Sequence, residues 1–170
     1  MADARDYLLL IHLAGVFLFL IAHGGAGSVG FRLRRERDPA RVAALLELSG
    51  STLSIMGIAW LLVIASGIAL GVLASTIPGA QLGWFYASIV LFIAVTFLMT
   101  PLASGYQKAR AALKLKPPMV SEKGWQKQLA KGYTADKLGE YLSESKPMAL
   151  AGVGFGGVLA LSYLMMFKPF

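Results

Sequence analysis

Residues 48–107 read LSGSTLSIMGIAWLLVIASGIALGVLASTIPGAQLGWFYASIVLFIAVTFLMTPLASGYQ and contain no Asp, Glu, Lys or Arg. Only the segment from Ser75 to Gln81, with its proline and glycine, interrupts the apolar character. A soluble domain buries interrupted faces of helices and strands, whereas a bilayer stabilises about 20 continuous apolar residues in one helix. The stretch therefore predicts two membrane-spanning helices joined by a short hairpin turn.

Two further stretches of the same kind flank this one. Residues 7–31 are uncharged apart from two histidines, and residues 147–167 are uncharged throughout. Hydrophobic residues make up 56% of the chain, and the 15% of charged residues is confined to the gaps between the apolar stretches. This distribution predicts an all-α membrane protein, a four-transmembrane-helix bundle that forms a single membrane domain over residues 1–170. The predicted spans lie at about 7–31, 49–73, 84–103 and 147–167.

Basic residues are distributed unevenly between the predicted connections. Residues 32–41 hold five of them, residues 74–83 hold none, and residues 104–146 hold nine. Lys and Arg resist translocation and bind anionic lipid on the inner side of the membrane. We therefore expect a bacterial-type inner (cytoplasmic) membrane, with loops 32–41 and 104–146 in the cytoplasm and both termini outside. The same rule predicts that the first span is retained and not cleaved as a signal peptide.

The net charge of +7 follows from these two basic connections. Because no nucleic-acid-binding motif accompanies the basic residues, no nucleic-acid partner is expected. The expected partners are the lipid bilayer and either other membrane subunits or a second copy of the chain.

Small residues recur at every fourth position inside three of the predicted spans, a spacing that lets helix backbones approach closely. The helix-packing candidates are Ala22, Ala26 and Gly30 in the first span, Gly67 and Gly71 in the second, and Gly152 and Gly156 in the fourth. Such faces favour packing within the chain, and an interface between copies is the alternative.

The connection at 104–146 is long enough to carry helices of its own. The third span is expected to continue as a helix from Tyr106 to Leu113 and to end before Pro117-Pro118. After the prolines, Ser121 can cap a second helix. That helix presents Trp125, Leu129 and Tyr133 on one face and lysines on another, a pattern typical of an interfacial helix on the membrane surface.

A short helical segment from Ala135 to Ser143 presents Leu138, Tyr141 and Leu142 in the same way. For both segments, docking onto a soluble partner or a neighbouring subunit is the alternative.

Polar chemistry inside the spans reduces to His12, His23 and a few hydroxyl groups, and the absence of cysteine excludes disulfides and thiolate metal sites. An ionisable residue within a span is a candidate functional residue, because its burial costs free energy. The two histidines are expected on one helix face, roughly 16 Å apart along the axis, too far to share one ion.

Met56 and Met99 are expected at about the depth of His23, and imidazole with thioether suits haem iron or Cu(I). His12 is expected nearer the outer side, with Ser66, Tyr86 or Tyr163 as a hydrogen-bond partner. The alternative is that each histidine is a neutral interhelical hydrogen-bonding residue and each methionine fills a packing gap.

Three short segments carry a family resemblance. LLIHLAGVFL of residues 9–18 and the arginine-rich turn with Asp38-Pro39-Ala40 resemble the four-span superfamily of the CopD copper-resistance proteins, and the terminal LMMFKPF of residues 164–170 resembles its uncharacterised members. The same superfamily includes the membrane-bound HemJ-type protoporphyrinogen oxidases and uncharacterised small membrane proteins, to which the similarity is strongest. In the HemJ-like branch the resemblance implies that the first-span histidine, here His12, is a haem ligand.

Two functions are therefore compatible with the sequence. The favoured hypothesis is a non-catalytic accessory module of a membrane assembly, because no Asp, Glu, Lys or Arg lies inside any predicted span. The alternative is a b-type haem or copper module that uses His12 or His23 for electron transfer or porphyrin oxidation. No catalytic residue is predicted.

Overall fold

The computed structural model describes residues 3–76 and 82–168, and every regular element in them is helical. The elements are α1 (Ala4–Leu33), α2 (Pro39–Ser75), α3 (Gly83–Leu102), α4 (Ser104–Ala112), α5 (Glu122–Leu129), the 3-10 turn η1 (Ala135–Lys137), α6 (Leu138–Glu144) and α7 (Pro147–Phe167). Four of these helices, α1, α2, α3 and α7, are long and apolar enough to cross a membrane, which confirms the predicted number and order.

Two sequence-based expectations fall on residues outside this description. The predicted hairpin turn at 75–81 lies outside the described residues apart from its first positions, and so do residues 169 and 170 of the terminal motif.

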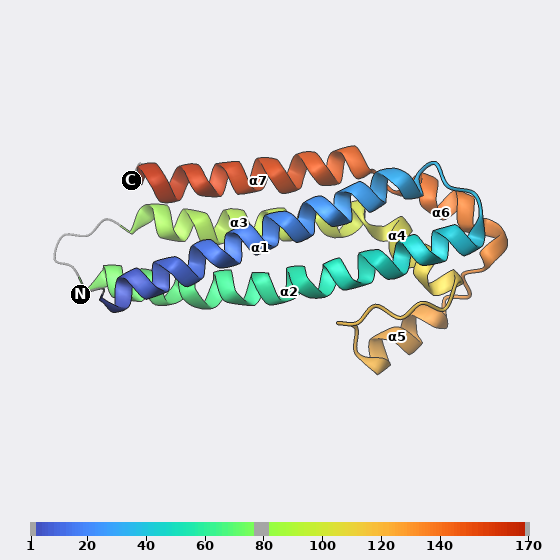
Figure 1. The fold of residues 1–170 in the computed structure, drawn as a ribbon, viewed down its shortest axis with the longest axis horizontal. Coiled ribbons are helices and arrows are strands. Elements are labelled where there is room, and N and C mark those ends of the chain that lie inside the picture. Colours follow the sequence, from blue (N-terminus) through green and yellow to red (C-terminus); the bar gives the residue numbers. More distant parts are fainter. Residues whose placement is uncertain (1–2, 77–81, 169–170) are drawn as a thin grey trace.

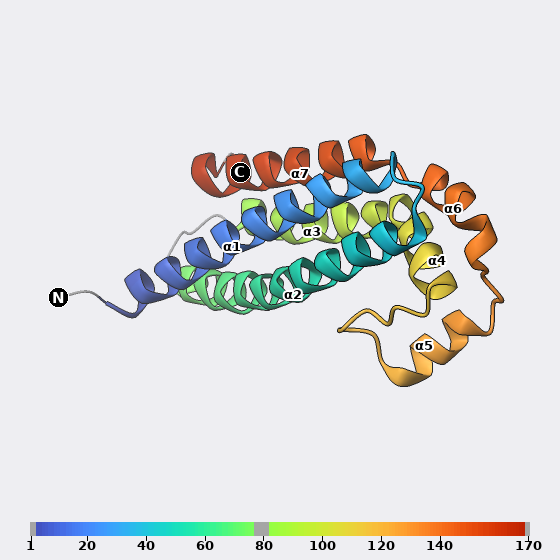
Figure 2. The same ribbon diagram turned by 45° about the vertical axis from the view of Figure 1, so that its right-hand side comes forward.

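The four long helices lie side by side along the long axis of the molecule (Figure 1). α1 packs mainly against α2 and also touches α7, whereas α3 packs mainly against α7. α4 and α6 cover the end where α1 turns into α2, and α5 stands apart from the long helices beside α2 (Figures 1 and 2). The chain therefore has two helix pairs joined by α1, with a small helical cap at one end.

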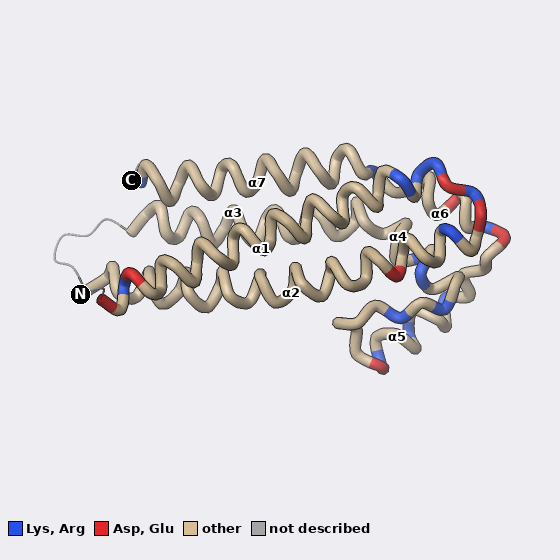
Figure 3. The backbone as a smooth tube through the Cα atoms, in the orientation of Figure 1, with Lys and Arg blue, Asp and Glu red and all other residues tan. Residues whose placement is uncertain are grey.

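Charge is gathered at the capped end (Figure 3). All Lys and Arg residues except Arg5 and Lys168 belong to the connections at that end or to the helices that flank them. We call it the charged end. The chain reaches the opposite end at both of its termini (Figure 1), so the basic connections lie on one side of the four apolar helices, as the sequence predicts.

α1 and α2 extend further toward the charged end than the predicted spans. α2 begins at Pro39, because the Asp38 side chain accepts a 2.9 Å hydrogen bond from the Ala40 amide and proline suits the first helical turn. α1 continues to Leu33. The arginine-rich connection therefore shortens to the few residues between the two helices.

Eight buried apolar residues form a cluster where these extensions meet the cap. They are Val29 and Leu33 of α1, Val42 and Leu46 of α2, Ala109 of α4, and Leu138, Tyr141 and Leu142 of α6. Along the spans, in contrast, large apolar side chains such as Phe17, Ile21, Phe97 and Leu159 are more than 60% exposed. An aqueous environment favours the first arrangement and a lipid environment the second.

The connection between α3 and α7 is helical in the predicted order. α3 ends at Leu102, just after Pro101, and α4 resumes at Ser104 and ends before Pro117-Pro118. Ser121 caps α5 by accepting a 3.2 Å hydrogen bond from the Gly124 amide, as expected.

Candidate functional site

His12 lies between α1 and α2 and is 5% exposed. Its Nδ1 is 3.1 Å from Ser66 Oγ, the first of the three hydrogen-bond partners expected from the sequence. Ser66 Oγ also lies 2.5 Å from the Leu62 carbonyl oxygen, which can only accept. The single hydroxyl proton is therefore used by Leu62, and His12 donates from Nδ1. The imidazole edge packs on Gly67, whose missing side chain makes the room for it.

His23 lies between α1 and α7 and is also 5% exposed. Its ring stacks on Phe19 with 5.7 Å between centroids and meets the edge of Phe155 at 5.3 Å. Nε2 points at the backbone of Gly154, so closely that a methyl group there would overlap the ring. Like Nε2 of His12, this nitrogen is buried and has no hydrogen-bond partner among the described residues.

The two histidines therefore serve different interfaces. His12 faces α2 and His23 faces α7. Met56 on α2 and Met99 on α3 are half-buried, while the close contacts of His23 are made by Phe19, Gly154 and Phe155. Within residues 3–76 and 82–168, no group of three or more His, Asp or Glu side chains could hold a metal ion.

The small-residue faces are used in part as predicted. Ala22 is buried and Ala26 half-buried, Gly30 packs against Tyr106 and Pro147, and the Phe85 ring covers Gly71. Gly152 and Gly156 are exposed with open space beside them, so the expectation that they pack within the chain is wrong.

Gly154 and Gly157 form the packed face of α7 instead, against His23 and Val95. The reason is geometric: residues two apart on a helix differ by about 200° in direction. The glycine run offers both faces, and only the neighbouring helices decide between them.

The cap contains a buried cation that the sequence did not single out. Arg110 of α4 is 4% exposed and reaches α2, where it donates to the Leu46 carbonyl oxygen and to Ser49 Oγ at 2.5 Å. Within the described ranges no carboxylate lies within 4.0 Å of it. Burial lowers the pKa of the Arg110 guanidinium, which stays charged nonetheless. Arg110 is one of nine basic residues in the connection at 104–146, and only its position on the inner face of α4 distinguishes it from the others.

A second hydrogen bond joins the cap to α1. Tyr106 donates its phenol proton to the Gly30 carbonyl oxygen at 3.2 Å. Burial raises the pKa of Tyr106, against smaller opposing effects of Ser145 and Arg34. α4 therefore binds both α1 and α2 through side-chain donors aimed at helix carbonyls.

The expected helix face that carries Trp125, Leu129 and Tyr133 does not point outward as the sequence pattern predicts. Trp125 is 6% exposed and Leu129 and Tyr133 are half-buried, so the indole packs inside the protein and does not face outward. Tyr133 contacts the edge of Tyr141, with 5.4 Å between centroids. Leu138, Tyr141 and Leu142 belong to the buried cluster of the cap and not to a membrane-facing surface, because α4 and α6 cover the extensions of α1 and α2.

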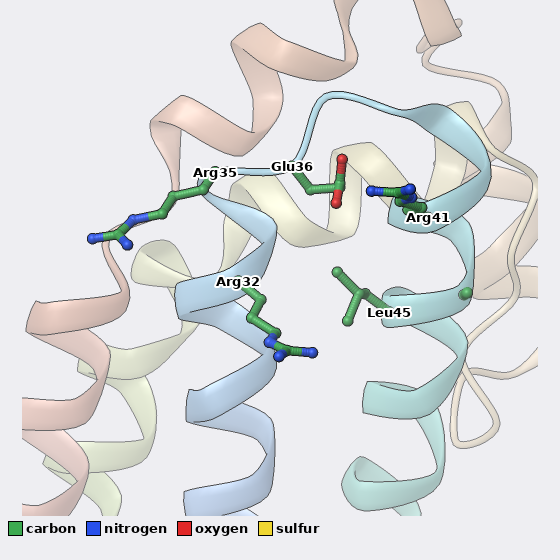
Figure 4. Close-up of a pocket in the computed structure, with 6 residues that line it drawn as sticks. Arg32, Arg35, Glu36, Arg41 and Leu45 are labelled. Carbon is green, nitrogen blue, oxygen red and sulfur yellow. The ribbon is translucent and has the colours of Figure 1, made fainter.

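An open depression of about 500 Å³ lies between α1 and α2 at the charged end, lined by Arg32, Arg35, Glu36, Arg41, Ala44 and Leu45. Figure 4 shows the Arg32 side chain directed into the gap toward Leu45, and Glu36 beside Arg41.

The acidic residues around the depression already have hydrogen-bond or ion-pair partners. Glu36 accepts from the Asp38 and Arg37 amides, bonds that lower its pKa, and Asp38 lies 3.6 Å from Arg41. Arg32 and Arg35 have no carboxylate within 4.0 Å in the part of the chain that the structure describes. Their guanidinium groups suit a phosphate.

No family model, no curated protein and no solved structure matches this chain.

Proposed function

We propose that the chain is a non-catalytic membrane module: a four-helix scaffold in a bacterial-type inner membrane that packs against other membrane subunits or against itself. The charged end lies in the cytoplasm and both termini lie outside, because the basic connections resist translocation. The Arg32 and Arg35 guanidinium groups then meet anionic headgroups of the inner leaflet.

One observation carries this proposal: both ionisable groups of the spans are used in packing between helices. His12 donates to Ser66 across α1 and α2, and His23 fills the space over Gly154 between two aromatic rings. A group that exchanges protons with solvent or binds substrate needs access to them, and both imidazoles are 5% exposed. The folded cap, fastened by Arg110 and Tyr106, gives the scaffold a defined surface for a partner.

The module is tested by solubilising native membranes in a mild detergent and measuring the mass of the complex that contains the chain. A complex larger than the 18.1 kDa chain in its micelle, with a second subunit or a second copy identified by mass spectrometry, supports the proposal. A monomer that shows turnover or redox activity by itself overturns it.

A haem or copper module is the second candidate, and the orientation of His12 favours it. Because Nδ1 donates to Ser66, the lone pair of Nε2 is free, and a ligating histidine is commonly held by such a donation from its other nitrogen. Haem, if bound, would supply one-electron chemistry, and His12 would hold its iron while Ser66 holds the imidazole ring in place.

The fit to a porphyrin is poor at both histidines. Nε2 of His12 is enclosed, and Nε2 of His23 is closed off by the Gly154 backbone. An absorption spectrum of the purified protein separates the candidates: a Soret band that His12→Ala removes supports haem, whereas a colourless, metal-free preparation removes this candidate.

A further inference from the structure

The loop between α4 and α5 runs along α2 and does not project away from it. Pro118 packs against Gly50 of α2, and the Met119 thioether packs against Gly57, one of the places where α2 has no side chain. Figures 1 and 2 show this loop reaching along α2 toward the middle of the bundle. Met119 is nevertheless 62% exposed, so α2 covers one side of the loop and no described residue covers the other.

The contact at Gly57 fixes the depth of the loop. Gly57 lies ten residues beyond Glu47, the last charged residue of α2, which is about 15 Å at 1.5 Å per residue. Counted from Ser75 at the other end of α2, it lies about 27 Å away. A hydrocarbon core is about 30 Å thick, so Gly57 is inside it by either count.

The backbone of the loop has few unpaired N–H donors. Within lipid each backbone N–H and C=O group needs a partner, since no water is present to supply one. Pro117 and Pro118 have no N–H, and the Val120 amide donates to the Pro117 carbonyl oxygen at 3.2 Å. In the described part of the chain, the unpaired backbone groups of these four residues are then the Met119 amide and the carbonyl oxygens of Pro118, Met119 and Val120.

The loop is flanked by charged residues but contains none. Residues 117–121 carry no charge, and Lys116 and Glu122 on either side form an ion pair of 2.7 Å. Lys114 and Lys123 lie just outside this pair. An uncharged tip closed by an ion pair and flanked by lysines matches the change from acyl chains to headgroups over a few residues.

We propose that Pro117–Val120 forms a finger that inserts into the acyl layer of the inner leaflet beside α2, with lipid chains as the partner of its exposed face. The finger anchors the cap to the membrane, a role that the sequence pattern had assigned to Trp125. The proposal rests on the membrane location given under the proposed function, and its test separates the two.

Because the chain has no cysteine, single spin labels can be placed without first replacing native cysteines. Three variants in liposomes of phosphatidylethanolamine and phosphatidylglycerol suffice: Met119→Cys in the finger, Ile58→Cys on the 56% exposed face of α2 beside Gly57, and Lys127→Cys on the exposed side of α5. Collision rates with oxygen, which concentrates in acyl chains, and with a water-soluble nickel chelate are measured for each label.

The finger predicts high oxygen and low nickel collision rates at positions 119 and 58, and the reverse at position 127. If position 119 behaves like position 127 while position 58 stays in lipid, the finger is wrong and the membrane location stands. If position 119 is shielded from both reagents, a protein partner covers it and the lipid finger is also overturned. If position 58 meets nickel freely, the membrane location fails and the finger with it.

Discussion

His12 and Ser66 share a 3.1 Å hydrogen bond that joins the two longest helices of the molecule, α1 and α2. Gly15 packs on Val63 and Gly25 on Thr52, so the same antiparallel register continues from this bond toward the charged end. The small residues bring the two backbones close, and the polar pair fixes how far one helix slides along the other. The His12–Ser66 hydrogen bond therefore sets the register between α1 and α2.

Ser66→Ala tests this relationship. The substitution leaves the His12 N–H buried without a partner, and we expect a loss of about 0.5–2 kcal/mol of unfolding free energy. Ser88→Ala is the control, because Ser88 is buried on α3 and bonds only the Trp84 carbonyl of its own helix. Thermal unfolding in detergent, followed by tryptophan fluorescence, measures both, and equal effects would contradict the register role.

The two glycine faces of α7 give a second prediction. Gly154→Ala places a methyl group into the His23 ring, and we expect a loss of about 1–3 kcal/mol from overpacking. Gly156→Ala meets open space and removes a helix-weakening glycine, so its stability should be unchanged or slightly higher. The same thermal measurement ranks the pair, and a Gly156→Ala variant that is the less stable of the two would instead indicate a second copy packed on that face.

The buried cation of the cap gives a third prediction. Arg110→Ala removes both donors from the Leu46 and Ser49 acceptors and leaves a void, for an expected loss of about 2–4 kcal/mol. The loss should be local, with trypsin cutting faster after Lys114 once α4 separates from α2. Arg35→Ala, at an exposed position, should leave the cleavage rate unchanged.

The opposite result for Arg110→Ala is physically meaningful. A buried charge without a carboxylate partner costs desolvation free energy, and its removal can stabilise a protein. An Arg110→Ala variant with a higher melting temperature and unchanged proteolysis would show that this cost exceeds the value of the two hydrogen bonds. The cap would then be held by its apolar cluster alone.

The spans could be predicted from the sequence because continuous apolar length is a local property. Apolar length alone does not show that α2 begins at Pro39, because Arg41 and Glu47 interrupt it, although Asp38 and Pro39 are a local start signal for a helix. A different ambiguity misplaced Trp125, Leu138 and Tyr141: an amphipathic face looks alike whether a membrane or another helix covers it.

The contacts within the bundle show a similar limit. Spacing identified Gly67 and Gly71 as packing positions, and His12 does pack on Gly67 and Phe85 on Gly71. In the glycine run of α7 every face contains small residues, so spacing could not tell Gly154 from Gly156. Arg110 and the finger at Met119 depend on contacts between segments more than 60 positions apart, which no local pattern records.

Tyr106 gives a prediction that depends on pH. Tyr106→Phe removes the hydrogen bond to the Gly30 carbonyl and should cost about 1 kcal/mol at neutral pH. Burial raises the pKa of Tyr106 in the folded protein above its ordinary value of about 10, so the unfolded chain loses the phenol proton first. The stabilisation by Tyr106 is therefore complete below pH 10 and declines as the pH rises through the higher value in the folded state.

The difference in melting temperature between the wild-type protein and Tyr106→Phe isolates this effect, since lysines and the other tyrosines titrate equally in both. The difference should stay constant up to about pH 10 and shrink above it. Tyr163→Phe, at a 55% exposed position on α7, serves as the control and should change the melting temperature little at any pH. A difference for Tyr106 that grows with pH would mean that the phenolate is the better-stabilised form, which the carbonyl oxygen of Gly30 as its partner does not allow.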